Sequence, residues 1–203
     1  SNINSYLSQL EEKRNMRSKL AILYTDDLKE YDFGAGHPIR GERYLMFHRF
    51  LTENVSEENC QIIGTEKAND EDLLFICEKE YIDFTRDYYK AANLGFDYDG
   101  RFYLFHSADN RPVGKPGKIE EAARLIIGQA KRAVDLVESG EFEKAVSIGG
   151  GLHHAKPAFG EGFCLYNDVA FTAKYLMHEY ALKRILILDT DAHAGNGTSE
   201  YFY

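Results

Sequence analysis

The sequence has few cysteines, no tryptophan and no long apolar run. Its three cysteines, Cys60, Cys77 and Cys164, are odd in number and form no C-x-x-C pair. This pattern argues against a disulfide framework and against a structural zinc knuckle. No segment is apolar enough for a signal peptide or a membrane span, so no membrane partner is expected. We expect a soluble protein of a reducing, cytoplasmic compartment.

Basic residues are also scarce, with 24 Lys and Arg against 33 Asp and Glu, which gives a formal net charge of -9. Such a surface repels nucleic acid and favours cationic partners such as lysine-rich peptides or polyamines. The 203 residues are 44% hydrophobic, enough for one well-buried core. Because no repeat, low-complexity tract or Gly/Ser linker marks a boundary, residues 1–203 are expected to form a single domain.

Hydrophobic patterning predicts one strand and several helices in the first two thirds of the chain. Residues 20–25 form a short β-favouring apolar run, and residues 107–118 are rich in turn-forming residues. Helical patterns cover residues 42–54, 70–93 and 119–138. In the last of these, apolar residues recur at three- and four-residue steps and predict one buried face: Ala122, Leu125, Ile126, Ala130, Ala133, Val134 and Val137.

The following residues read as a strand, a helix and a second strand. Residues 144–148 form the first strand, and Asn167 is a candidate N-cap for a helix over residues 167–182. Residues 184–189, "RILILD", are almost wholly apolar, as expected of a strand covered on both faces of a parallel sheet. A right-handed crossover makes the two strands parallel. The pattern predicts an α/β fold with three α-β-α layers and a mainly parallel sheet.

Two loops leave the carboxyl ends of these predicted strands, where α/β proteins gather their sites. The first, "GGGLHHA", carries His153 and His154, and the second strand ends at Asp189, ahead of Asp191 and His193. The topology therefore predicts that these five side chains converge.

The spacing of Asp189, Asp191 and His193 places all three side chains on one side of an extended chain. A carboxylate and an imidazole are ordinary zinc ligands, and a catalytic zinc keeps one position open for water. A lone D-x-H is more often part of a solvated loop. Here the preceding strand, the glycine-rich turn and the nearby histidine pair favour a metal site.

Three motifs in order, "GGLHHA", "GFCLYNDVAF" and "LDTDAHAGNGT", resemble those of the zinc-dependent histone deacetylase family. "YDFGAGHPIRGERY" and "SADNRPV" are similar to that family's earlier loops, so the resemblance extends from Leu20 onward. It implies an arginase-like α/β fold. It also implies that residues 1–203 are the N-terminal part of a deacetylase domain whose C-terminal part is absent.

The resemblance also implies roles for individual residues, position by position. Asp191 and His193 would be zinc ligands, and His153 and His154 would lie beside the zinc-bound water. Asp189 would orient His153, and Asn196 would stand beside His154. Gly162 and Phe163 would line the channel for an acyl-lysine side chain, and Asp109 at the rim would hold the backbone of a peptide.

The implied activity is hydrolysis of an acetyl or other acyl amide on a lysine or a polyamine, with one catalytic Zn²⁺ and His154 as the base. The resemblance further implies a structural monovalent cation near Asp189. The expected partners are an acetylated lysine protein, an acetylpolyamine or a small acylated amine.

The chain departs from the family pattern in three places. Ala194 replaces a histidine that many members carry, and Asn196 replaces an aspartate found in some branches. The third zinc ligand and the tyrosine that stabilises the oxyanion lie beyond Tyr203 in the family. We therefore expect the 203-residue chain alone to be inactive and to bind zinc poorly. An exposed edge of its sheet would favour self-association.

Two alternatives remain open at this point. "DAHA" also resembles the metal motif of arginases, but Gly195 has no carboxylate to bridge two manganese ions, as such a ureohydrolase requires. The other alternative is a non-catalytic fragment or domain that keeps the fold and binds acylated lysine or partner proteins.

Overall fold

The computed structural model describes residues 5–12, 19–96 and 98–203. Its sheet has three strands in the order β2-β1-β3, namely β1 (Leu20–Leu23), β2 (Cys60–Ile63) and β3 (Lys144–Ser147). Both pairings are parallel, and Leu20 of β1 lies opposite Cys60 on one side and Lys144 on the other. The sequence predicts β1 and β3. It does not predict β2, because this strand is short and half polar.

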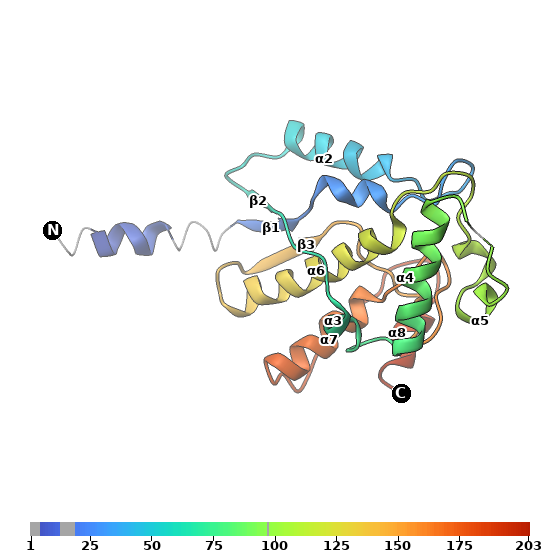
Figure 1. Ribbon diagram of the computed structural model, residues 1–203. Coiled ribbons are helices and arrows are strands. Elements are labelled where there is room, and N and C mark those ends of the chain that lie inside the picture. The colour runs from blue at the N-terminus through green and yellow to red at the C-terminus, as the bar shows by residue number, and fades with distance from the viewer. Residues whose placement is uncertain (1–4, 13–18, 97) are drawn as a thin grey trace.

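Helices lie on both sides of this sheet (Figure 1). Helix α2 (Glu42–Asn54) lies on one side, and α6 (Ile119–Glu138) and α7 (Asp168–Glu179) lie on the other. Strand β1 contributes to two clusters: Ala21 and Leu23 pack with Leu136 and Phe142, while Ile22 joins the main core. Because alternate residues of a strand face opposite sides, one strand serves both layers. The predicted α/β fold is confirmed.

Further elements complete the described fold. They are η1 (Asp26–Glu30), α3 (Asp70–Leu73), α4 (Lys79–Asn93), α5 (Phe102–Phe105), η2 (Ala108–Asn110) and α8 (Asn196–Glu200), and residues 5–12 are also helical. The region 70–93, predicted as helical, is divided between α3 and α4. A capping box between Asn69 and Asp72 starts α3. The backbone N–H of Glu78 donates to the Pro157 carbonyl 2.8 Å away, outside any helix, just before α4 begins.

Helices α6 and α7 follow the sequence pattern closely. Helix α6 has the predicted bounds, and five of its seven predicted face residues are buried, with Ala133 and Val137 partly exposed. Helix α7 starts at the predicted cap, because the Asn167 side chain accepts from the Ala170 N–H at 2.9 Å. It ends at Glu179, shortly before Ala181 takes a left-handed φ of 53° that a helix does not contain.

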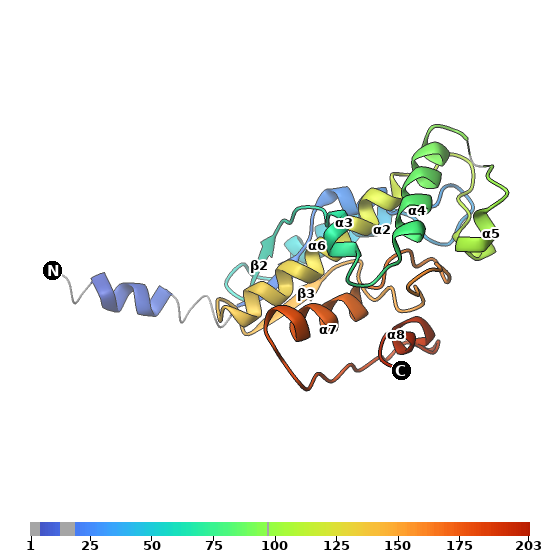
Figure 2. The same ribbon diagram turned by 60° about the horizontal axis from the view of Figure 1, so that its bottom comes forward.

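The prediction of a buried strand at residues 184–189 is wrong for this structure. The segment is extended but unpaired, and Leu186 and Leu188 are 90% and 80% exposed. Figure 2 shows it running outside the sheet between α7 and α8. Among the described residues β3 pairs only with β1, so residues 144–148 and 184–189 do not share a sheet. A strand needs a hydrogen-bonded neighbour, and this segment does not pair with the outer edge of β3, the edge that faces away from β1.

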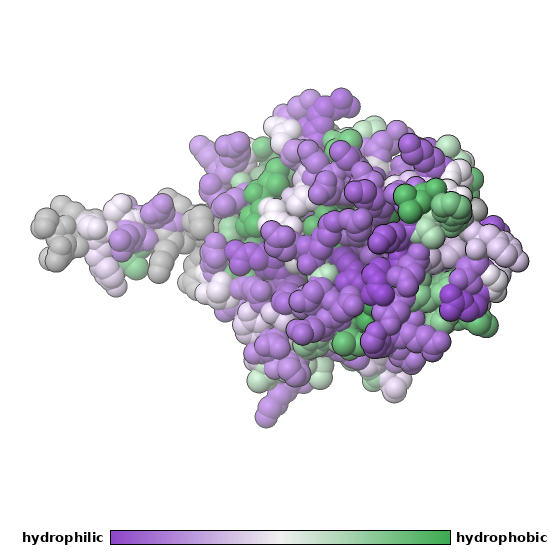
Figure 3. Space-filling view, viewed as in Figure 1, coloured by the Kyte–Doolittle hydropathy of each residue, from purple (hydrophilic) through white to green (hydrophobic). Residues whose placement is uncertain are grey.

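The surface of the described part is largely polar. The face seen in Figure 3 is mainly hydrophilic, with apolar patches between the polar side chains. Among the described helices, none has both the length and the apolar character needed to cross a bilayer.

Candidate active site

The loop after β3 holds the two adjacent histidines. Asp168, at the start of α7, accepts hydrogen bonds from the N–H groups of Gly151 and Leu152 at 2.8–3.0 Å. Burial raises the pKa of this carboxyl group, and the two N–H donors oppose that rise. His153 is only 7% exposed. The loop is therefore fixed to a helix terminus before any ligand arrives.

The chain returns to this loop at α8 rather than through a neighbouring strand. The Thr198 N–H donates to the His153 carbonyl at 3.0 Å. Gly197 packs so closely that a Cβ there would lie 2.4 Å from the backbone carbonyl of His154. This contact brings the segment from Asp189 to Asn196 against the histidines. The structure thus joins the predicted residues although the predicted strand is absent.

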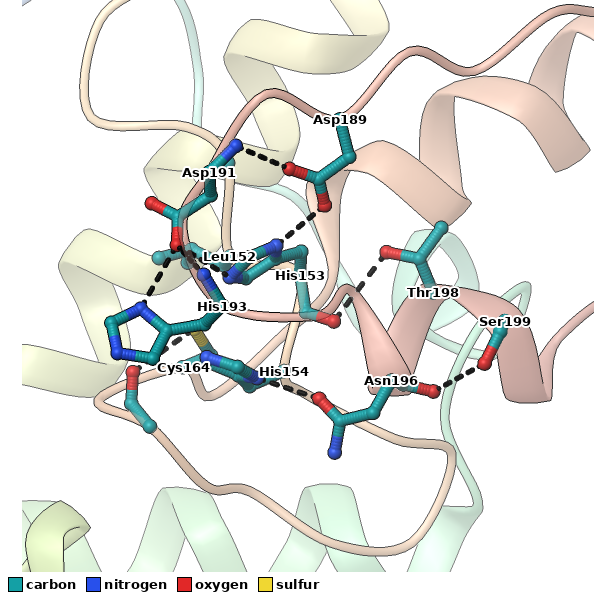
Figure 4. A network of polar contacts seen from close by, with 12 residues as sticks. Leu152, His153, His154, Cys164, Asp189, Asp191, His193, Asn196, Thr198 and Ser199 are labelled. Atoms are coloured by element: carbon teal, nitrogen blue, oxygen red, sulfur yellow. Dashed lines mark hydrogen bonds and ion pairs between the residues drawn. The ribbon is translucent and has the colours of Figure 1, made fainter.

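Each histidine of the pair has a polar partner at its Nδ1 atom (Figure 4). The His153 Nδ1 atom lies 2.6 Å from Asp189 Oδ2, and the His154 Nδ1 atom lies 2.6 Å from Asn196 Oδ1. The two ring centroids are 4.2 Å apart. The hydrogen bond from His153, followed by the N–H of Asp191, lowers the pKa of Asp189.

Asp191 and His193 lie beside the pair and are more exposed. Asp191 Oδ1 is 3.0 Å from His193 Nδ1 and 4.0 Å from His153 Nε2. The backbone N–H of His193, followed by its ring, lowers the pKa of Asp191. A carboxylate and an imidazole fit a zinc site chemically, but a catalytic zinc needs about three protein ligands. Within the described ranges, no three His, Cys, Asp or Glu side chains are grouped to hold a metal ion.

A cavity of about 880 Å³ opens onto this constellation. The predicted residues that line it are Asp109, His153, His154, Gly162, Phe163, Asp191 and His193. Asp189 and Asn196 stand behind the histidines. Asp109 Oδ2 accepts from the Gly162 N–H at 3.1 Å, so the predicted rim and channel residues are in contact with each other.

The Gly162–Phe163 turn is held in a conformation that few residues adopt. Both have left-handed φ angles, 60° and 66°, which for Phe163 costs about 1–2 kcal/mol. A Cβ on Gly162 would lie 2.3 Å from His154 Cδ2, so only glycine permits this approach. The Phe163 N–H donates to Asn110 Oδ1 at 2.8 Å, and its carbonyl accepts from Tyr31 at 2.6 Å. Two buried side chains therefore fix the cavity wall.

Four residues that support the site were missed by sequence reasoning: Tyr31, Asn110, Glu161 and Asp168. Burial raises the pKa of Tyr31 well above its usual range and so keeps its hydroxyl a donor. Asp168 follows the cap residue Asn167, where an acidic residue ordinarily indicates only a favourable interaction with the helix dipole. Glu161 and Asn110 adjoin predicted residues, and this adjacency was the only available signal.

Gly195 and Asp189 bear on two further predictions, the two-metal ureohydrolase alternative and the monovalent cation. A Cβ at position 195 would lie 2.5 Å from Asp189 Oδ2, so a side chain there would displace the Asp189 carboxylate from its present position. Asp189 uses one oxygen for His153 and the other for the N–H of Asp191. The monovalent cation near Asp189 stays a prediction.

Comparison with known proteins identifies the family. A profile of the histone deacetylase domain matches residues 37–203. The acetoin utilization protein AcuC of Staphylococcus aureus (strain COL) is 34% identical over 186 residues, which are 92% of this chain and 46% of that protein. The AcuC proteins of Staphylococcus xylosus and Bacillus subtilis (strain 168) are 33% and 32% identical over 93% and 90% of this chain, and over 48% and 46% of their own lengths.

The chain belongs to the histone deacetylase family, as its motifs and its α/β fold indicate. It spans about half the length of these relatives.

Proposed function

We propose that this chain carries the histidine pair and two metal ligands of a zinc-dependent deacylase, which hydrolyses an acetyl or related acyl amide on a lysine or polyamine. The proposal includes the cytoplasmic location expected from the sequence. The observation that carries the proposal is the pair of 2.6 Å contacts, His153 to Asp189 and His154 to Asn196, beside a cavity that Asp191 and His193 also line. A binding domain has no need of two oriented imidazoles at the base of its cavity.

The two histidines are suited to different tasks because their partners differ. His153 is paired with the Asp189 carboxylate, which can only accept, so the His153 Nδ1 atom carries a proton. His154 faces a neutral amide oxygen, so its Nδ1 donates and its Nε2 is free to accept a proton. We assign to His154 Nε2 the removal of a proton from the attacking water. The C–N bond then breaks, and the leaving amine takes a proton from the pair, giving acetate and free amine.

Zinc, when held by Asp191, His193 and a third protein ligand, would supply the charge that polarises the acyl carbonyl and acidifies water. The residues of the cavity wall would bind and orient the substrate. Phe163, with Gly162 beside it, offers an apolar surface for the methylene chain of a lysine or polyamine. The Asp109 carboxylate at the rim is placed to attract a cationic amine or to hold a peptide N–H.

The direct test is hydrolysis of an acetyl-lysine peptide and of an acetylpolyamine, with zinc and with a chelator. We expect the full-length natural protein to be active and chelator-sensitive, and the 203-residue chain alone to be inactive. His154→Ala should lower kcat by about 10²-fold or more. His178→Ala is the matched control, because His178 is exposed and lies outside the cavity.

Four outcomes would count against the proposal. Full activity of His154→Ala would remove the assigned base. Chelator-insensitive turnover would remove the metal, and tight binding of the acetylated peptide without turnover would favour the non-catalytic alternative. Hydrolysis of a guanidino compound instead of the amides would favour the ureohydrolase.

A further inference from the structure

Asn196 contacts two side chains at once, and only one of them belongs to the histidine pair. Its Oδ1 atom lies 2.6 Å from His154 Nδ1, and its Nδ2 atom donates to Oε1 of Glu161. In Figure 4 the amide oxygen of Asn196 faces His154, and the amide nitrogen points away from it. Glu161 precedes the Gly162–Phe163 turn and has a side chain that is 27% exposed.

The two histidines differ in how their tautomers are fixed. Asp189 can only accept, so the Nδ1 atom of His153 must carry a proton. An amide such as Asn196 can present either an oxygen or an NH₂ group. It therefore does not fix the tautomer of His154 by itself. With the NH₂ group turned to His154, Nδ1 would be the acceptor and the proton would sit on Nε2. That tautomer has no lone pair at Nε2 to take a proton from water.

Glu161 removes this ambiguity because a carboxylate accepts and does not donate. It attracts the NH₂ end of Asn196 and so leaves Oδ1 for His154. The resulting order, His154 Nδ1–H to Asn196 and Asn196 Nδ2–H to Glu161, is a chain of donors running in one direction. Such chains strengthen each member bond.

The position of Glu161 is itself fixed. The Glu161 carbonyl accepts from the Cys164 N–H at 2.9 Å, closing the turn that follows it. The Lys156 ammonium lies 3.6 Å from the Glu161 carboxylate and 3.1 Å from that of Glu200. The Glu161 carboxylate thus has two partners, the Lys156 ammonium and the Asn196 amide.

We propose that Glu161 is a positioning residue that sets the His154 tautomer through Asn196 and keeps Nε2 unprotonated toward the cavity. The value of this tautomer for catalysis rests on the proposed function, but the tautomer itself does not.

The test is ¹⁵N NMR of the histidine rings in the full-length protein at alkaline pH, since a neutral ring shows one protonated and one unprotonated nitrogen. His154→Gln assigns the signals. The wild type should show His154 protonated on Nδ1. Glu161→Lys offers only donors, so Asn196 should turn and the proton should move to Nε2. Glu200→Ala is the matched control, because it removes the other partner of Lys156 and should leave the tautomer unchanged.

A second pair of variants covers the case in which Glu161→Lys does not fold. Glu161→Ala leaves Asn196 free to turn, and both His154 tautomers should appear. Adding Asn196→Asp should restore a single Nδ1–H form, because both aspartate oxygens accept. A role of Glu161 limited to pairing with Lys156 predicts no such rescue.

In the deacylase assay Glu161→Lys should lower kcat about tenfold or more with KM within about threefold, and Asn196→Asp should rescue Glu161→Ala. An unchanged His154 tautomer in Glu161→Lys or in Glu161→Ala would overturn the proposal. A tautomer switch in a protein with no deacylase activity would support the role of Glu161 and contradict the proposed function.

Discussion

The two loops that meet in the cavity are built very differently. The histidine loop, residues 149–155, is attached to other elements through Asp168 of α7 and Thr198 of α8. In the metal-ligand loop, residues 189–195, the N–H groups of Asp191 and His193 are bonded to side chains two residues earlier. The side chains of Asp191 and His193 are 53% and 77% exposed.

The difference shows which half of the site is prepared in advance. The first loop follows a strand that is paired in the sheet, whereas the second follows a segment with no neighbour. Proton-transfer groups are therefore held rigidly, and the metal ligands are held mainly by their own turn. Preorganised groups lose little freedom when a substrate binds, and the histidine loop has more contacts with other elements to provide this preorganisation.

The largest expected effect comes from removing the attachment of the histidine loop. Asp168→Ala should lower the free energy of unfolding by about 2–4 kcal/mol, because the N–H groups of Gly151 and Leu152 lose their acceptor. Asp191→Ala should leave the free energy of unfolding close to that of the wild type. Urea unfolding measures both. Equal effects of the two substitutions would mean that the loops do not differ in the way described.

The support behind the cavity wall should show in the response to acid. Burial lowers the pKa of His106 to about 3, and this side chain bonds to Thr85 and approaches Asn110. Since the unfolded pKa is about 6.5, stability is fully present above that pH and falls toward pH 3, by up to about 1.4 kcal/mol per pH unit. His106→Gln should flatten this slope in urea unfolding from pH 7 to 3. Parallel slopes would show that His106 ionises freely in the folded protein.

A smaller acid effect should come from the contact between the two loops. Because His153 lowers the pKa of Asp189, the contribution of this ion pair is present above the unfolded aspartate pKa of about 3.9. It is lost as the pH falls through the lower folded value. The stability difference between wild type and Asp189→Asn should therefore be largest above about pH 4 and shrink below it. A difference that grows as the pH falls would contradict the pairing.

The smallest effect is expected at the unpaired segment. Leu186→Lys with Leu188→Lys should change the free energy of unfolding of the 203-residue chain by about 0.5 kcal/mol or less, because both side chains are exposed. Leu23→Lys, which buries a charge in the sheet, is the contrasting variant. A large loss in the double variant would mean that the segment is a buried strand after all.

Much of the fold was accessible from local patterns. The spacing of apolar residues predicted α6, and Asn167 predicted the start of α7, because both signals act within a few residues. The prediction of a strand at residues 184–189 failed for the opposite reason. An apolar run predicts only that burial would be favourable. Whether the segment pairs with β3 and is covered depends on contacts between distant parts of the chain, and the described residues do not make them.

The sequence by itself determined which groups are available: two adjacent histidines, an aspartate and an amide to face them, and two donors of the kind that zinc binds. Only the tertiary structure decided how those groups are directed. Three contacts each join residues at least 16 positions apart: Asp168 with the histidine loop, α8 with His153, and Asn196 with His154 and Glu161. The direction of a hydrogen bond depends on which donor approaches which acceptor, and only the folded chain fixes that approach.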